Sequence, residues 1–307
     1  MSNANPIGAA MPAIAGERRE IRGMVEVVLA MVLAGSSVVV GKLLSVRIPV
    51  FLSAELSLCF ALLAILPAQI ARRRELLLLG KRELSFMFLQ ALFGIVLFRV
   101  FTLYGLHFTT AAHAGLITSA SPAVMTVIAA VALKERMSAR GAAGAALAMG
   151  GILLINFSGI SAPPHPGFLW GNLLVLAATV CEVFLTIFRK SSGGRVGSIT
   201  NTTVLVAMSA VMLLPFALLD LRSFPLDRIE IVGWLALFYY GAIATVIAYI
   251  LWGHGALLIP AGRTGIATAA MPLSALILSA IILGEKLGMV HAAGCAAVIA
   301  GLALGRK

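Results

Sequence analysis

Charged residues are scarce in this chain: Asp, Glu, Lys and Arg make up 11% of it, against 61% hydrophobic residues. Soluble domains carry roughly a quarter charged residues, so the composition excludes a soluble globular protein. The three cysteines all fall within apolar runs, which excludes a disulfide framework. The sequence contains no Walker A, Gly-x-Ser-x-Gly or His-Glu-x-x-His motif. We therefore expect neither an enzyme nor a bound cofactor or metal.

The charges that are present lie mostly between the apolar runs, and the net charge is +11. Basic residues gather before the first run and after the second, fourth, sixth and tenth runs, whereas the alternate connections carry few of them. Cytoplasmic loops of membrane proteins are enriched in Lys and Arg. The distribution predicts a multi-pass protein of the cell inner membrane with both termini in the cytoplasm. Its basic excess reflects its topology in the lipid bilayer and not a nucleic-acid partner.

Ten apolar runs are long enough to cross about 30 Å of hydrocarbon as α-helices. They are residues 24–44, 49–70, 85–106, 111–133, 139–157, 168–188, 198–219, 231–252, 259–283 and 288–304. The connections between them are short, so no soluble domain is inserted. The predicted fold is an all-α membrane protein with ten transmembrane helices.

The second half of the chain repeats the first. A shift of 150 positions (272 minus 122) aligns Pro122 with Pro272 and Glu135 with Glu285, without a gap. Such a period indicates a duplicated unit. Because each unit holds five spans, an odd number, the second copy is inverted in the membrane. The predicted organisation is an N-terminal cytoplasmic tail (1–22), a five-helix repeat (23–157), a Pro-rich connector (158–166) and a second five-helix repeat (167–307).

Ionisable side chains within the spans are functional candidates, because each costs at least about 2.5 to 3.5 kcal/mol to insert. Glu55 and Arg99 lie at similar depth in neighbouring antiparallel spans. This placement predicts either a salt bridge between them or a role in binding a zwitterion. Glu182, near the middle of the sixth span, is expected to exchange a coupled proton, meet a substrate amine or hydrogen-bond a neighbour. Lys42, near a span end, is expected to reach the interface or form a gating ion pair.

Pro122 and Pro272 interrupt helices at equivalent positions of the two copies. A proline frees the carbonyl four residues before it, here at Thr118 and Thr268, and bends the helix. In lipid that carbonyl needs a neighbouring helix or a water-lined cavity. Two such breaks in inverted halves predict hinges beside a central site, as in secondary transporters. Kinks that serve only packing are the alternative.

Polar and aromatic side chains within the spans complete the candidate site. The residues expected to face the substrate are Ser36, Ser37, Arg99, Thr118, Ser119, Glu182, Tyr240 and Tyr249. The two tyrosines combine an apolar body with a polar tip, which favours an aromatic or amphipathic organic substrate. Trp170 and Trp252, near span ends, are typical of the interfacial aromatic belt.

Over nearly its whole length the chain resembles the ten-span EamA-type exporters of the drug/metabolite transporter superfamily. One mark of the resemblance is a helix that carries a proline and ends in a Gly-Glu-basic step, here Gly284-Glu285-Lys286. Gly35-Ser36-Ser37 followed by Lys42 is similar to the first-span signature. The chain departs from the pattern at Glu55, where these proteins commonly carry arginine.

The resemblance implies export of small organic solutes, amino acids included, through a central cavity lined by spans one, three, four, six, eight and nine. Some members of the family export aromatic amino acids. Glu135 and Glu285 match family positions and lie at helix ends on opposite faces, which suggests gates or ion pairs. We therefore expect a secondary transporter that exports amino acids or related metabolites by alternating access. Export of drugs or other metabolites, a membrane-embedded enzyme and a scaffold are the alternatives.

Small residues in spans five and ten, such as Gly144 and Gly294, would let helices approach closely. We expect these faces to pack within one chain, which predicts a monomer. A homodimer through the same faces is the alternative.

Overall fold

The computed structural model describes residues 6–77, 79–118, 167–191, 196–258 and 270–304, with scattered positions between 121 and 154. This described part of the chain contains helices and no strands. Six of its helical stretches are long and apolar enough to cross a membrane, and two shorter apolar helices follow near the C-terminus. The predicted all-α membrane class is therefore confirmed. Most of the fourth and fifth predicted spans lies outside the described residues.

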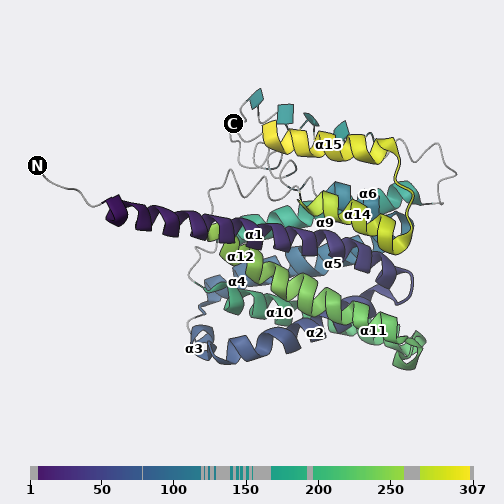
Figure 1. The fold of residues 1–307 in the computed structure, drawn as a ribbon. Coiled ribbons are helices and arrows are strands. Elements are labelled where there is room, and N and C mark those ends of the chain that lie inside the picture. Colours follow the sequence, from purple (N-terminus) through teal and green to yellow (C-terminus); the bar gives the residue numbers. More distant parts are fainter. Residues whose placement is uncertain are drawn as a thin grey trace, which may run out of the picture.

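The first copy begins with a helix that is longer than its predicted span. Its elements are α1 (Pro6–Ser45), α2 (Val50–Ile70), the short α3 (Arg73–Leu76), α4 (Lys81–Ala91), the π-helical η1 (Leu92–Leu97), α5 (Phe98–Phe108) and α6 (Ala111–Thr118). α1 continues through most of the predicted N-terminal tail, and its first turns project beyond the other helices in Figure 1. α4, η1 and α5 follow one another without a break and together make the third span.

The second copy is built in the same way. Its elements are α9 (Phe168–Ser191), α10 (Ser198–Ser223), the short η3 (Leu226–Arg228), α11 (Ile231–Phe238), the π-helical η4 (Tyr239–Ile247), α12 (Ala248–Leu258), α14 (Ala270–Leu283) and α15 (Met289–Leu304). α11, η4 and α12 together make the eighth span. α1 packs against α12, α14 and α5, so the opening helix of the first copy is surrounded largely by the second copy.

Thr109, at the end of α5, shows that the opening helices of the two copies run in opposite directions. Its carbonyl accepts a hydrogen bond from Lys42, in the last turn of α1, at 2.8 Å. Its hydroxyl donates to Asn172, in the first turn of α9, at 2.6 Å. The C-terminal end of α1 and the N-terminal end of α9 therefore lie at the same end of the bundle. This is the arrangement that an inverted repeat requires.

The bundle places apolar side chains on its outside and many polar ones inside. Val211, Trp170 and Ile281 are each at least 70% exposed. By contrast, Ser57 and Gln90 are fully buried. Lipid covers the outer side chains at no cost, whereas polar side chains in hydrocarbon need partners that only other helices supply. The buried polar side chains, set in a mainly apolar interior, are therefore the groups that can bind a solute.

Glycines bring helix backbones together at several crossings of the described bundle, including those of α5 with α9 and of α2 with η4. At the crossing of α5 and α9, a Cβ atom on Gly105 would lie 2.8 Å from the Gly171 carbonyl oxygen, and the reverse also holds. At the crossing of α2 and η4, a Cβ atom on Gly241 would overlap the Ser57 carbonyl oxygen. Small residues allow this close approach in membranes. The Gly241 crossing matters for function because Ser57 also contacts the site described below.

We predict that Gly241→Ala destabilises the protein, because the added methyl group must push η4 away from the α2 backbone. Overpacking of this kind costs typically about 1 to 3 kcal/mol. The matched control is Gly253→Ala in α12, where the new methyl group would meet only the Ser198 side chain, at 3.3 Å. Thermal unfolding of the detergent-purified variants measures the difference. Equal melting temperatures for the two variants would contradict the prediction.

Candidate substrate cavity

A cavity of about 370 Å³ lies inside the bundle. Small-molecule sites are typically about 300–1,000 Å³, so the cavity has the size of a metabolite site. Its lining comes from α1, from η1 and α5, from α6, α9 and α14, and from η4 and α12. These elements belong to spans one, three, four, six, eight and nine, the six from which the family resemblance predicts the cavity.

The cavity brings together six of the eight residues expected to face the substrate. They are Ser37, Arg99, Thr118, Glu182, Tyr240 and Tyr249. Ser36 does not line the cavity; its hydroxyl instead forms a hydrogen bond with the Tyr239 hydroxyl at 2.7 Å. Ser119 lies outside the described residues. Ser37 and Thr118 donate to carbonyls of their own helices, so their oxygens can still accept a hydrogen bond from a solute.

Arg99 is a buried polar residue of the cavity that contacts two neighbouring helices. Only 5% of it is exposed. It donates to the Ser57 hydroxyl on α2 and to the Thr245 hydroxyl on η4, each at 2.5 Å. Its guanidinium carbon lies 4.6 Å from the centre of the Tyr240 ring, a cation–π contact. One side chain therefore joins α5 to α2 and to η4.

The predicted salt bridge between Glu55 and Arg99 is wrong. The ion pairs formed by the described residues do not include this pair, and Arg99 instead contacts Ser57. The reason is the geometry of α2: residues two apart on an α-helix point about 200° apart. Because Ser57 faces Arg99, Glu55 faces another side of α2. The Glu55 carboxylate accepts a long contact from Cys59 Sγ at 3.9 Å.

Glu182 supplies the acidic side chain of the cavity lining, from α9. It is partly buried, and Ser121 of the fourth span lines the same cavity. Arg99 is held on α5 by hydrogen bonds to α2 and η4, whereas Glu182 lines the cavity from α9.

Two π-helical turns face the cavity from corresponding spans of the two copies. η1 contributes Gly94 and Ile95, and η4 contributes Tyr240, Ala244 and Thr245. In η4 the Thr245 hydroxyl donates to the Tyr240 carbonyl, five residues back, at 2.7 Å. π-helical turns are rare and are frequent at functional sites. No periodicity of apolar residues reveals them, which is why the sequence analysis did not single out Thr245.

Trp252 and Thr102 also line the cavity, although the sequence analysis did not assign them to it. Trp252 was expected in the interfacial belt because it lies near the end of its span. The Trp252 side chain instead lines the cavity. Its position along the span therefore did not predict the direction in which it points. Thr102 gave one weak signal: it lies three residues after Arg99, on the same helical face.

Lys42 and Glu285 bind helix-end backbone groups at one end of the bundle, which we call the Glu285 end. Lys42 donates to the carbonyls of Leu106 and Thr109, at 2.6 and 2.8 Å, where α5 ends. The Glu285 carboxylate accepts the backbone N–H groups of Ala111 and Ala112, at 2.8 and 3.0 Å, where α6 begins. Each charge matches the sign that the helix terminus prefers. These contacts tie α14 of the second copy to α6 of the first.

Gly284 explains why Glu285 can reach α6. It has a φ of +66°, in the left-handed region that glycine adopts without strain. The Glu285 N–H bonds the Ser279 carbonyl at 3.3 Å, which closes the end of α14. Of the other predicted hinge and gate residues, Pro272 lies buried in the first turn of the described α14. Pro122 and Glu135 lie outside the described residues.

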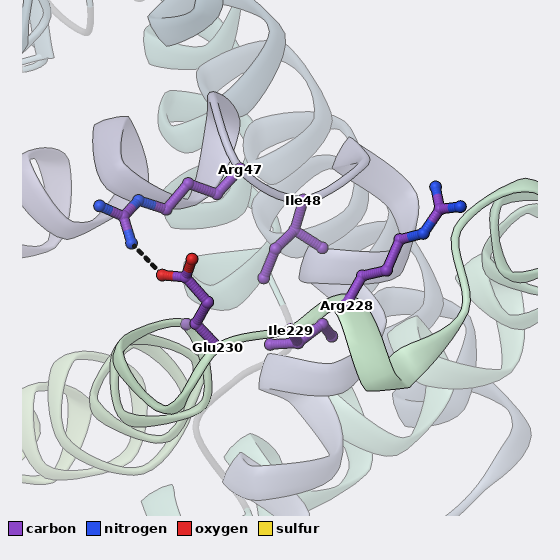
Figure 2. Close-up of a pocket in the computed structure, with 6 residues that line it drawn as sticks. Arg47, Ile48, Arg228, Ile229 and Glu230 are labelled. Carbon is purple, nitrogen blue, oxygen red and sulfur yellow. Dashed lines mark hydrogen bonds and ion pairs between the residues drawn. The ribbon is translucent and has the colours of Figure 1, made fainter.

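A second, smaller pocket of about 210 Å³ opens at the surface, between the α1–α2 connection and η3. Figure 2 shows Arg47 and Glu230 pointing toward one another across it, 3.3 Å apart, while Arg228 points away. This pair joins a connection of the first copy to one of the second. Both members are largely exposed, so the pair contributes little stability. Within the described residues, no group of three or more His, Cys, Asp or Glu could hold a metal ion.

A helical bundle of inverted repeats, with a central cavity that places a few polar groups in a largely apolar lining, is typical of secondary membrane transporters. The chain belongs to the EamA-like transporter family, whose description matches residues 21–157 and again residues 169–305. It is a transporter and not an enzyme. The duplication seen in the sequence is therefore a pair of EamA domains, which places the chain in the drug/metabolite transporter superfamily.

Related proteins are also named transporters. The "Uncharacterized transporter YetK" of Bacillus subtilis (strain 168) is 34% identical over 286 residues, which cover 93% of this chain and 87% of that protein. An "Uncharacterized transporter" of Archaeoglobus fulgidus is 27% identical over 231 residues, 74% of this chain and 80% of that protein. A solved structure titled "Crystal structure of protein" has the same fold, with a TM-score of 0.59 and 21% identity over 94% of this chain and 96% of that one.

We predict that Glu55 and Arg99 are energetically independent. A double-mutant cycle of Glu55→Gln and Arg99→Gln, measured as free energies of unfolding in SDS titrations, should give a coupling energy below about 0.5 kcal/mol. The positive control is the cycle of Ser57→Ala and Arg99→Gln. It should give more than about 1 kcal/mol, because a hydrogen bond to a charged group is removed. If the coupling energy of Arg99 with Glu55 were larger than that with Ser57, a salt bridge between Glu55 and Arg99 would be supported after all.

Proposed function

We propose that this chain is an inner-membrane secondary transporter that exports small organic solutes, foremost amino acids, by alternating access. The observation that carries the proposal is a single cavity lined by one buried guanidinium, Arg99, and one carboxylate, Glu182. A zwitterion offers each of these groups a partner of opposite charge. A neutral solute would leave the Arg99 guanidinium without a counter-charge from the described residues in a site of low dielectric constant, which is costly.

The rest of the lining favours an apolar or aromatic side chain on the amino acid. Phe98, Tyr249 and Trp252 contribute aromatic surface to the cavity. Met31 and Met271 add flexible thioethers, which adapt to irregular apolar shapes. This lining also suits apolar drugs or other metabolites, which are the second candidate class. The cavity is complete within one chain, so we propose that a monomer suffices for transport.

The Glu285 end is the proposed outer gate. The distribution of basic residues assigns this end to the outside and both termini to the cytoplasm. In the described conformation the outer gate is closed by Glu285 and Lys42. Opening requires the N–H groups of Ala111 and Ala112 to leave the Glu285 carboxylate. We propose that bending at Pro122 and Pro272 accompanies this step.

We predict that purified protein in liposomes releases preloaded radiolabelled phenylalanine or leucine, and that Glu182→Gln lowers this release at least tenfold. The amide keeps the size of the side chain but not the charge that attracts the substrate ammonium. The control is Glu230→Gln, which changes a carboxylate outside the cavity and should leave release unchanged. Wild-type rates in Glu182→Gln would remove Glu182 from the mechanism. If the wild-type protein releases no amino acid, the amino-acid assignment is rejected.

We predict that Glu285→Ala opens the outer gate. The lost helix cap costs about 1 kcal/mol, which changes the populations of closed and open states roughly fivefold. Val38→Cys, placed in the cavity wall of a variant without native cysteines, reports opening through its rate of labelling by an impermeant maleimide in right-side-out vesicles. Labelling should become several-fold faster in Glu285→Ala and stay unchanged in Glu230→Ala. Equal rates in all three proteins would contradict the gate.

A further inference from the structure

Arg99 has hydrogen-bonding capacity to spare on the cavity side. A guanidinium carries five N–H donors, and the described residues accept two of them, through the hydroxyls of Ser57 and Thr245. Both acceptors are neutral, and none of the ion pairs formed in the described part of the chain includes Arg99. Within the described part of the chain, this buried cation therefore lacks a counter-charge.

Thr102, beside this cation, has a buried hydroxyl without a hydrogen-bond partner among the described residues. It lies one turn after Arg99 on α5 and lines the same cavity, with 4% of its surface exposed. Other buried threonines behave differently: Thr118 and Thr179 each donate to the carbonyl four residues back. A buried hydroxyl without a partner costs about 1 to 3 kcal/mol, so Thr102 is expected to have a ligand.

We propose that Arg99 and Thr102 form the subsite that binds the carboxylate of the transported solute. Two carboxylate oxygens match the parallel donors of a guanidinium, and the remaining lone pairs accept a hydroxyl hydrogen. This assignment rests on the proposed function and goes beyond it, because it requires a free carboxylate on every good substrate. It also sets the orientation of an amino acid, with its carboxylate at α5 and its ammonium toward Glu182 on α9.

A carboxylate fits this subsite better than a phosphate. Among the described residues of the cavity lining, Arg99 is the cation and Glu182 the carboxylate, so these residues carry no net charge. One negative charge beside Arg99 is compensated there, but the second charge of a phosphate ester would face no cation of this described lining. The Tyr240 ring covers part of the guanidinium, which leaves the donors that face the cavity as the place for a ligand.

The test compares acids with their amides. Binding of phenylalanine and phenylalaninamide, of leucine and leucinamide, and of 3-phenylpropanoate and 3-phenylpropanamide is measured by calorimetry on the full-length protein in detergent. The wild-type protein should bind each acid at least tenfold more tightly than its amide, including the pair that lacks an ammonium group. Thr102→Val should weaken acid binding about tenfold or more, because a hydrogen bond to a charged group is lost.

Three controls separate this role from a structural one. Thr102→Val should keep the wild-type melting temperature, because its hydroxyl has no partner in the described structure. Thr102→Ser should restore acid binding. Thr179→Val, which removes a buried hydroxyl outside the cavity, should bind acids as the wild type does.

Two outcomes would overturn the proposal: acids and amides that bind equally to the wild-type protein, or acid binding that is unchanged in Thr102→Val. Failure of the proposed function looks different. In that case the protein still distinguishes acids from amides, but no amino acid is released from liposomes.

Discussion

Hydrocarbon around the bundle is the constraint on which the other features of this protein depend. Water cannot reach the outer faces of the spanning helices, so each backbone amide is bonded within its own helix and polar side chains gather inside. Ser57, Gln90 and Arg99 are buried, whereas Val211 and Trp170 face outward. Some of these buried polar side chains both join helices of the bundle and line the cavity, as Arg99 and Thr245 do. Binding and packing are therefore served by the same side chains.

Arg99 illustrates this double use. Its hydrogen bonds reach α2 and η4, so the cation helps to hold three helices in register. Glu55, which could have neutralised it, faces another side of α2. A buried cation without a counter-charge among the described residues is expensive to maintain, and a fold optimised only for stability would replace it. Its presence, with Tyr240 against it and Thr102 beside it, is explained most simply by a substrate that brings the missing negative charge.

Contacts at the Glu285 end join the two copies of the inverted repeat. Glu285 of the second copy bonds the start of α6 in the first copy, and Lys42 bonds the end of α5. Both are contacts between a side-chain charge and helix-end backbone groups, which break and form again without stranding a second buried charge. The Gly-Glu-basic step in the sequence has its physical explanation here: Gly284 turns the chain and Glu285 caps a helix of the other copy.

The sequence by itself determined that this is a duplicated, all-helical membrane transporter, because apolar run length, the distribution of basic residues and an internal period are properties read along the chain. It also identified six residues that meet in one cavity, since depth in a span follows from counting. The tertiary structure alone decided which polar groups meet. Arg99 and Thr245 are 146 positions apart, and π-helical turns that no residue period reveals lie just before Arg99 and around Thr245. The depth of a side chain in the membrane follows from its position along the span. The direction in which it points around the helix depends also on the π-helical turns and on the neighbouring helices. This direction makes Ser57, and not Glu55, the partner of Arg99.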